Sequence, residues 1–272
     1  MGTPGDAYDV TVNVRTDDLA ALDRELIENR CRADGNRASG AESNAAGPRH
    51  IGMTPERTCA RAYSVRAAMV YGIDVSGWQE NIRWTDVPKS EVQFVFAKAT
   101  EGLRYYNDRF HEQHDGAKRS GIPFGTYHYL DVRDSGAAQA KHFLTAISGY
   151  EGTLLPALDV EEAHGRSPQR IAACVADFLK TVDATLQGKR ALLYTNKAFW
   201  NDAMAGCDDF SDHPLWIAQY PKRYRSGMQP ALPQGWKSAV IWQFTQSASV
   251  PGIAGVADMD QLIGDVLSTI SR

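Results

Sequence analysis

The sequence predicts an α/β protein that folds as an irregular barrel, mainly because of the order of its apolar segments. From residue 70 onward, short apolar runs alternate with helical patterns or loops, which is typical of a mostly parallel sheet covered by helices. The runs cover residues 70–75, 94–99, 123–130, 154–160, 191–195, 215–220 and 239–245. Seven or eight strands fit this spacing, but too few helical patterns remain for a complete eightfold repeat.

Three helices are expected, over residues 107–120, 137–147 and 168–186. The first ends at Gly121, and the third begins behind Ser167 and ends before Gly188, which are the usual residue types at helix ends. Helical patterns become sparse after the fifth apolar run, so the last part of the barrel is predicted to be the irregular part.

Residues 1–68 differ in character from the rest of the chain. Residues 8–14 alternate at strand period, a helical pattern follows, and residues 32–48 are rich in Gly, Ala, Ser and Asn. One strand and one helix cannot bury a core. We therefore expect a poorly ordered N-terminal extension, or a translation start placed upstream of Met69, and a barrel domain over residues 69–272.

The composition excludes several classes of partner. A net charge of −4 gives no reason to expect a nucleic-acid binder or a basic membrane anchor. Residues 1–14 lack the features of a secretory signal, and no segment has the apolar length of a membrane span. Cys31, Cys59, Cys174 and Cys207 are too dispersed for a redox or zinc motif, so free thiols are expected. A neutral polymer is the substrate class that fits best.

Polar and aromatic side chains follow nearly every predicted strand, at the edge where parallel α/β proteins collect their reactive groups. Asp159 and Glu161 are two residues apart on one strand, so their side chains share a face with Cα atoms roughly 6 to 7 Å apart. Two carboxyls in a partly dry cleft cannot both ionise freely, and one can then donate a proton near neutral pH. Acetal cleavage needs such an acid, although the pair could also simply end a strand at solvent.

Aromatic residues near the strand ends suit the faces of sugar rings, but most such residues fill a barrel core, so about a third are expected in the cleft. They are Trp78, Tyr127, Tyr129, Tyr194, Trp216, Tyr220 and Trp242. His128 is interpreted either as a substrate contact or as a structural histidine. The His111–His114 segment has the wrong order for a zinc motif, and no phosphate loop or serine-hydrolase motif occurs.

Seven motifs in order over residues 70–265 resemble glycoside hydrolase family 25, the Chalaropsis-type lysozymes common among phage endolysins. They are YGIDVSGWQ from Tyr71, FVFAKATEG from Phe94, GTYHY from Gly125, LDVE from Leu158, YTN from Tyr194, LWIAQY from Leu215 and WQFT from Trp242. The resemblance implies a TIM-like (β/α)5(β)3 barrel. It also implies hydrolysis of the β-1,4 bond between N-acetylmuramic acid and N-acetylglucosamine in peptidoglycan, without a metal or organic cofactor.

The resemblance assigns roles to individual residues. Glu161 matches the general acid, Asp159 the carboxylate that assists it, and Asp74 the acid of the first strand. Asp258 is the better match to a fourth acid, with Asp260 standing where Asn is usual. The expected substrate contacts within the motifs are Lys98, Glu101, Tyr127, His128, Tyr194, Trp216, Gln219 and Trp242.

The favoured hypothesis is a monomeric muramidase that acts on the cell wall, either outside the cell or after release from a host cytoplasm by phage lysis. Its mechanism uses the substrate's own 2-acetamido group as nucleophile, with a direct Asp nucleophile or an inverting route left open. Three rival interpretations are a chitinase-like hydrolase, a wall-binding barrel without turnover, and a phage structural protein with residues 1–68 as an assembly segment.

Overall fold

A computed structural model describes residues 69–205, 207, 210–225, 227–264 and 267–272 of the chain. The expected extension over residues 1–68, including Cys31 and Cys59, lies outside the described residues. Of the other two cysteines, Cys174 is a buried free thiol and Cys207 a partly buried one.

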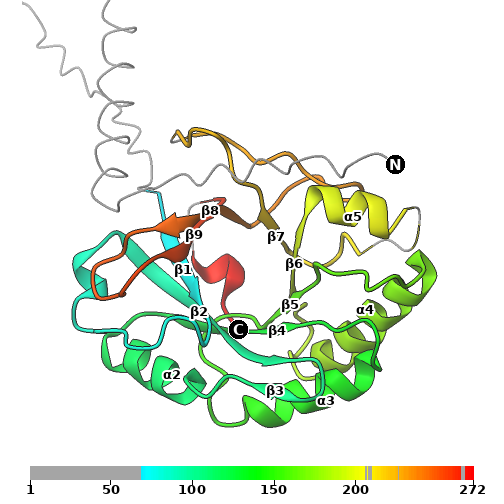
Figure 1. The fold of residues 1–272 in the computed structure, drawn as a ribbon, viewed down its shortest axis with the longest axis horizontal. Coiled ribbons are helices and arrows are strands. Elements are labelled where there is room, and N and C mark those ends of the chain that lie inside the picture. Colours follow the sequence, from blue (N-terminus) through cyan, green and yellow to red (C-terminus); the bar gives the residue numbers. More distant parts are fainter. Residues whose placement is uncertain (1–68, 206, 208–209, 226, 265–266) are drawn as a thin grey trace, which may run out of the picture.

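Eight strands close into a barrel, and Figure 1 looks into it with the helices around part of its outside. A ninth strand, β3 (Tyr105–Tyr106), forms a short hairpin with β2. The strands of the barrel are β1 (Tyr71–Val75), β2 (Val92–Glu101), β4 (Phe124–Tyr129), β5 (Ala157–Asp159), β6 (Leu192–Asn196), β7 (Leu215–Ala218), β8 (Ile241–Ala248) and β9 (Ala257–Leu262). All seven predicted strands are present.

The strand directions explain the irregularity of the barrel. Strands β1, β2, β4, β5, β6, β7 and β8 pair in parallel in that order. Strand β9 then runs antiparallel to both β8 and β1 and joins the two edges. Closure matters because an open edge would leave a row of backbone donors and acceptors without partners. The predicted irregular barrel is therefore confirmed, with its departure from a regular repeat at β8 and β9.

The helices connect the parallel strands and pack outside them. They are α2 (Phe110–Arg119), α3 (Gly136–Ala146), α4 (Pro168–Asp183) and α5 (Lys197–Ala203), with the short 3₁₀ turn η1 (Val87–Lys89) between β1 and β2. The hydroxyls of Ser135 and Ser167 cap α3 and α4 by accepting backbone N–H groups. Helix α2 begins three residues later than predicted because the Asn107 side chain turns inward, where its Nδ2 donates to the Lys98 carbonyl at 2.7 Å.

Large side chains fill the barrel beneath its open end. Phe94 and Phe96 of β2 are fully buried, and glycines on the two neighbouring strands make room for their rings. A Cβ atom on Gly72 would lie 2.2 Å from the Phe94 ring, and one on Gly125 would lie 2.2 Å from the Phe96 ring. The core can therefore contain both phenylalanine rings because the neighbouring positions are glycines, and any larger residue there would overlap the rings.

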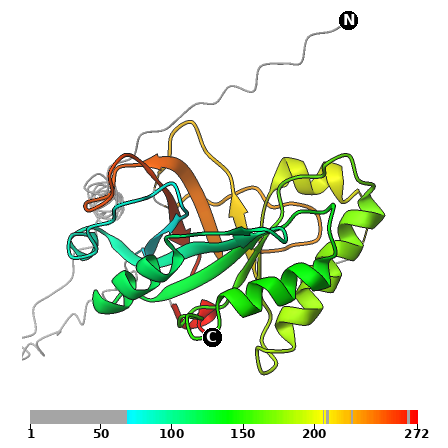
Figure 2. The same ribbon diagram turned by 60° about the horizontal axis from the view of Figure 1, so that its bottom comes forward.

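The other end of the barrel is closed by the C-terminal turn η2 (Leu267–Ile270), which Figures 1 and 2 show beside the C-terminus. Ile270 is fully buried, and its carbonyl accepts the backbone N–H of Leu155 at 2.7 Å. In the described part of the chain, no helix has both the length and the apolar character of a membrane span. The carboxyl ends of the parallel strands lie at the opposite end of the barrel from this turn.

Candidate active site

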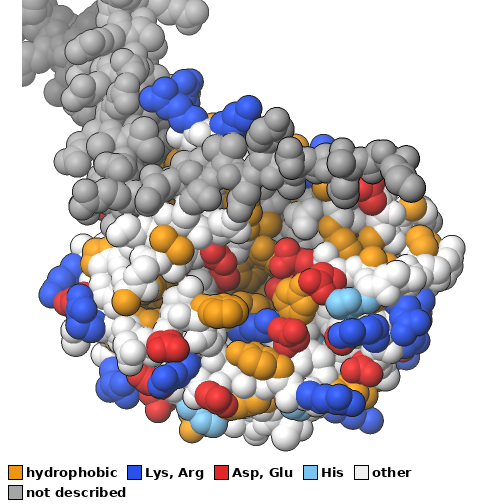
Figure 3. Space-filling view, viewed as in Figure 1, with side chains coloured by type: hydrophobic (Ala, Val, Ile, Leu, Met, Phe, Trp, Pro, Cys, Tyr) orange, Lys and Arg blue, Asp and Glu red, His pale blue; other side chains and the backbone are white. Residues whose placement is uncertain are grey.

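A cavity of about 200 Å³ opens at the carboxyl ends of the strands, and Figure 3 shows the hollow with acidic and apolar side chains around its mouth. Residues from all eight strands of the barrel, together with the loops after β1 and β5, converge on it. Its lining consists of Asp74, Ser76, Trp78, Lys98, Tyr127, Tyr129, Asp159, Glu161, Tyr194, Trp216, Gln243 and Asp258. The four predicted acids therefore lie together in one cavity.

Asp159 and Glu161 form the first carboxyl pair. Asp159 ends β5 and is 6% exposed, whereas Glu161 follows the strand and is partly exposed. The two carboxyls are close enough to affect each other's pKa, and the charge of Glu161 raises that of Asp159. The Oδ1 atom of Asp159 is buried and has no hydrogen-bond partner among the described residues. This pair thus places two carboxyls with raised pKa values near the mouth and keeps one acceptor atom free.

Asp74 and Asp258 form the second pair, on strands that run side by side. They are direct partners in the antiparallel ladder of β1 and β9, a position that brings Cβ atoms to about 5 Å. Asp74 is buried and Asp258 partly exposed, and the charge of Asp258 raises the pKa of Asp74. Each pair therefore combines one mostly buried carboxyl with one that is more exposed, and all four line the cavity.

Gln243 of β8 orients the buried acid of the second pair. Its Nε2 donates to Asp74 Oδ2 at 2.6 Å, and its Oε1 accepts the hydroxyls of Tyr194 at 2.8 Å and Tyr220 at 2.6 Å. The sequence analysis did not select Gln243, although it lies inside the WQFT motif. The signal that could have found it is the period of the strand, because Gln243 points to the face opposite Trp242.

Burial and mutual repulsion raise the pKa of every acid in the cavity. Desolvation is the main cause at Asp74 and Asp159, followed by the charges of Asp258 and Glu161 respectively. Burial, supported by the charge of neighbouring Glu162, also raises the pKa of Glu161. Burial and the charge of Glu161 raise the pKa of Asp258 to about 6. The cavity can therefore keep protonated carboxyls at a pH where exposed carboxyls are ionised.

Four of the predicted substrate contacts line the cavity: Lys98, Tyr127, Tyr194 and Trp216. Glu101 forms an ion pair with Lys98 and lines an adjoining hollow. Burial and the surrounding carboxylates raise the pKa of Tyr127 and Tyr194, so both phenols remain hydrogen-bond donors. Among the described residues, no group of three or more His, Cys, Asp or Glu side chains could hold a metal ion.

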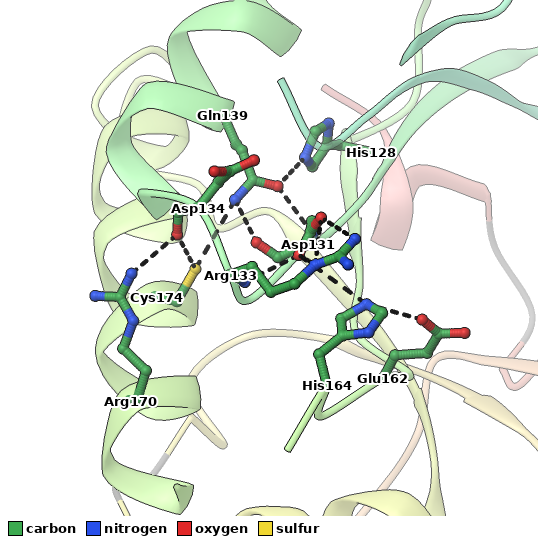
Figure 4. Close-up of polar contacts among 9 residues, drawn as sticks. All are labelled: His128, Asp131, Arg133, Asp134, Gln139, Glu162, His164, Arg170 and Cys174. Atoms are coloured by element: carbon green, nitrogen blue, oxygen red, sulfur yellow. Dashed lines mark hydrogen bonds and ion pairs between the residues drawn. The ribbon is translucent and has the colours of Figure 1, made fainter. Parts of the chain in front are cut away.

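His128 is not a substrate contact, which corrects one of the two interpretations of this residue. Its side chain is fully buried on the outer face of β4, where the ring stacks on Phe178 at 4.9 Å. Figure 4 shows the ring directed towards Gln139, and the Nε2 atom lies 3.1 Å from Gln139 Oε1. Burial lowers the pKa of His128 to about 3, so the ring is neutral and structural.

Trp242 and Gln219 also lie outside the cavity lining, contrary to prediction. Trp242 is 1% exposed on the outer face of β8, and its Nε1 donates to the Gln219 carbonyl at 2.7 Å. The Oε1 atom of Gln219 accepts the backbone N–H of Ala231 at 2.6 Å. Both side chains therefore anchor the loop after β7 instead of facing the cavity.

The loop that carries Glu161 is tied to the neighbouring loop after β4 (Figure 4). His164 Nε2 lies 2.9 Å from Glu162 Oε2 and 4.0 Å from Asp131 Oδ1. Asp131 is fixed in turn by Arg133, at 2.7 Å, and by Gln139, whose Oε1 accepts the Asp131 backbone N–H at 2.9 Å. These contacts join the loops after β4 and β5 on either side of the first carboxyl pair.

Asp260 lies one layer below the cavity and holds the indole of Trp216. It is fully buried on β9, and its Oδ1 accepts Trp216 Nε1 at 2.8 Å. Its Oδ2 has no hydrogen-bond partner among the described residues. Burial raises the pKa of Asp260 well above its ordinary value, with a further contribution from the charge of Asp258. Asp258, not Asp260, is therefore the fourth acid that faces the cavity.

Replacing Asp260 by Asn should stabilise the protein increasingly as pH rises. The pKa of Asp260 is higher in the folded chain than in the unfolded chain. The free energy of unfolding therefore falls as pH rises from the ordinary Asp pKa to the raised pKa of the folded state. Asp260→Asn keeps an acceptor for Trp216 and removes this penalty. The melting temperature of the variant should be a few degrees higher than that of wild type near neutral pH. A change of about 1 kcal/mol in the free energy of unfolding shifts the melting temperature by about 2–4 °C.

The gain should vanish in acid, where Asp260 is protonated in both states. Asp177→Asn, an exposed change on α4, is the matched control and should follow wild type at every pH. A melting curve for Asp260→Asn with the same pH dependence as wild type would show that Asp260 is not a neutral buried acid.

Comparison with known proteins identifies the family to which this chain belongs. The model of the glycosyl hydrolases family 25 matches residues 73–253. The autolytic lysozyme of Clostridium acetobutylicum is 35% identical over 72% of this chain and 56% of its own length. The uncharacterized protein YegX of Escherichia coli K12 is 32% identical over 72% of this chain and 71% of its own. A bacterial lysozyme structure from Streptomyces coelicolor, 27% identical, covers 74% of this chain and 95% of its own with a TM-score of 0.65. The chain belongs to glycosyl hydrolases family 25.

Proposed function

We propose that the protein is a lysozyme that hydrolyses the β-1,4 bond between N-acetylmuramic acid and N-acetylglucosamine in bacterial peptidoglycan. The observation that carries the proposal is that Asp159 and Glu161 line the same cavity as a second acid pair, Asp74 and Asp258. Family membership and lysozymes among the relatives support the same substrate. Cell lysis or wall turnover is the biological role that this activity would serve.

Glu161 is the proposed general acid. It is the more accessible member of its pair, and its raised pKa lets it keep a proton to a higher pH than an exposed glutamate does. It would protonate the glycosidic oxygen as the bond to the anomeric carbon breaks, and then remove a proton from the attacking water. Lys98 limits how far these pKa values rise, because its positive charge lowers the pKa of both Asp159 and Glu161.

Asp159 is proposed to act on the substrate's 2-acetamido group. Its buried Oδ1 can accept the amide N–H, since no described residue occupies it. The acetamido oxygen would then attack the anomeric carbon from the face opposite the departing oxygen, forming a cyclic intermediate that water opens. Asp74 and Asp258 would hold the sugar ring and sustain the negative potential that favours positive charge at the anomeric carbon.

Replacing Glu161 by Gln should abolish most of the activity, with a loss of about 10²–10⁴-fold because general acid catalysis is removed. The assay is reducing-end release from purified peptidoglycan, followed by borohydride reduction and mass spectrometry of the products. Wild type should release fragments that end in reduced muramic acid. The Glu91→Gln variant, which removes an exposed carboxyl just before the amino end of β2, is the matched control and should retain most activity.

Melting curves of both variants would show that they remain folded. Reduced glucosamine ends, or cleavage of chitin in place of peptidoglycan, would replace the proposal with a glucosaminidase or a chitinase. Absence of sugar release from folded wild type would favour the wall-binding barrel. Full activity of the Glu161→Gln variant would show that Glu161 is not the general acid.

The first-formed product should retain the configuration of the cleaved bond, because attack by the acetamido group and then by water inverts the anomeric carbon twice. Proton NMR of the anomeric signals during the first minutes of hydrolysis measures this, before mutarotation mixes the anomers. An inverted first product would contradict the substrate-assisted route and favour direct attack by water.

A further inference from the structure

Trp78 is the most exposed large apolar side chain among the described residues. It lies on the loop after β1 at the edge of the catalytic cavity, and it is 91% exposed. A tryptophan usually buries most of its surface, since exposed apolar area is unfavourable in water. An exposed indole beside a cleft is therefore typical of a surface that a ligand covers.

The backbone beneath Trp78 is held firmly although its ring is free. Ser76 accepts the Trp78 N–H through its Oγ at 3.3 Å, and Gln79 Oε1 accepts the Ser76 N–H at 2.9 Å. Gln113 of α2, which is 2% exposed, donates its Nε2 to the Ser76 carbonyl at 2.8 Å. Asn107 holds Gln113 in turn, with Nδ2 donating to Oε1 at 3.0 Å. This network thus fixes the backbone that carries the indole.

A second hollow, here called the side groove, continues from the catalytic cavity past Trp78. It has a volume of about 580 Å³ and shares Ser76, Trp78 and Lys98 with the cavity. The rest of its lining is Gly77, Glu80, Glu101, Tyr105, Asn107, Asp108 and Arg109. Tyr105 is 41% exposed, and its hydroxyl would lie 2.8 Å from a Cβ atom on Gly77. The absence of a side chain at Gly77 lets a second aromatic residue approach Trp78.

We propose that the side groove binds one further sugar residue of the same glycan strand, with a face of its ring on Trp78. This inference rests on the proposed function, because it extends the path of that substrate beyond the cleaved bond. Aromatic faces beside carboxylate and guanidinium groups suit a sugar ring with its hydroxyl and acetamido groups. Trp78 is then a specificity-determining residue that selects long strands.

The charges of the side groove favour a sugar over the peptide stem of peptidoglycan. Lys98 forms an ion pair with Glu101, and Arg109 lies 3.5 Å from Glu112. Both cations of the described lining are thus already paired with carboxylates, and Glu80 and Asp108 add negative charge. An acidic stem peptide would be repelled there, whereas a neutral N-acetylhexosamine would not.

Cleavage of peptide-free glycan strands of increasing length tests the proposal. Trp78→Ala should lower kcat/KM about tenfold on long strands, equivalent to about 1.4 kcal/mol, and leave the shortest strand that wild type cleaves nearly unaffected. Trp78→Phe keeps a stacking ring and should recover most of the loss. Leu103→Ala removes a neighbouring exposed apolar side chain outside the groove lining and should behave as wild type.

An equal loss on every strand length would overturn the proposal, because Trp78 would then serve the sugars at the cleaved bond. Unchanged kinetics, or a loss only on strands that carry peptide, would also overturn it. If wild type releases no sugar at all, the proposed function fails by itself. Calorimetric titration of the same strands into wild type and Trp78→Ala then still tests binding in the side groove. The proposal predicts that the variant binds long strands more weakly than wild type does.

Discussion

The hydrogen bond from Gln243 Nε2 to Asp74 Oδ2, 2.6 Å long, organises the open end of the barrel. It joins β8 to β1 across the cavity, and the same amide oxygen accepts hydroxyls from Tyr194 on β6 and Tyr220 after β7. An amide is suited to this position because it donates to a carboxylate and accepts from phenols without adding charge. The second acid pair and two tyrosines are fixed through one neutral side chain.

This arrangement explains how a folded chain tolerates several carboxyls in a small volume. Charged carboxylates at this density would repel each other and lose hydration, so protons remain bound and the pKa values rise. The parallel strands deliver these groups to one end, and the antiparallel β9 adds Asp258 opposite Asp74. The strand that makes the barrel irregular is thus also the strand that completes the acid set.

The strands and the acids could be predicted from sequence because both leave local signals. Apolar runs mark the seven predicted strands, and the Asp159–Glu161 spacing places both side chains on one face. Strand β9 could not be located in this way, since its sequence, ADMDQL, has buried polar residues where an apolar run is expected. Its place becomes evident only when the barrel closes and β1 and β8 both pair with it.

The errors among the predicted contacts share a physical cause. His128 and Trp242 each lie one residue from a cavity residue, Tyr127 or Gln243, and side chains alternate between the two faces of a strand. A motif identifies the strand but does not say which face is inward. Gln219 follows Ala218 at the end of β7, where the chain turns away and the amide binds the loop.

The central claim is that the barrel keeps Glu161 protonated at a pH where an exposed glutamate is ionised. Carbon-13 NMR of the side-chain carboxyl carbons, followed against pH, measures this directly, and the signal missing from Glu161→Gln identifies Glu161. Glu161 is predicted to titrate clearly above the ordinary glutamate value of about 4.3. A Glu161 midpoint at or below that ordinary value would contradict the central claim.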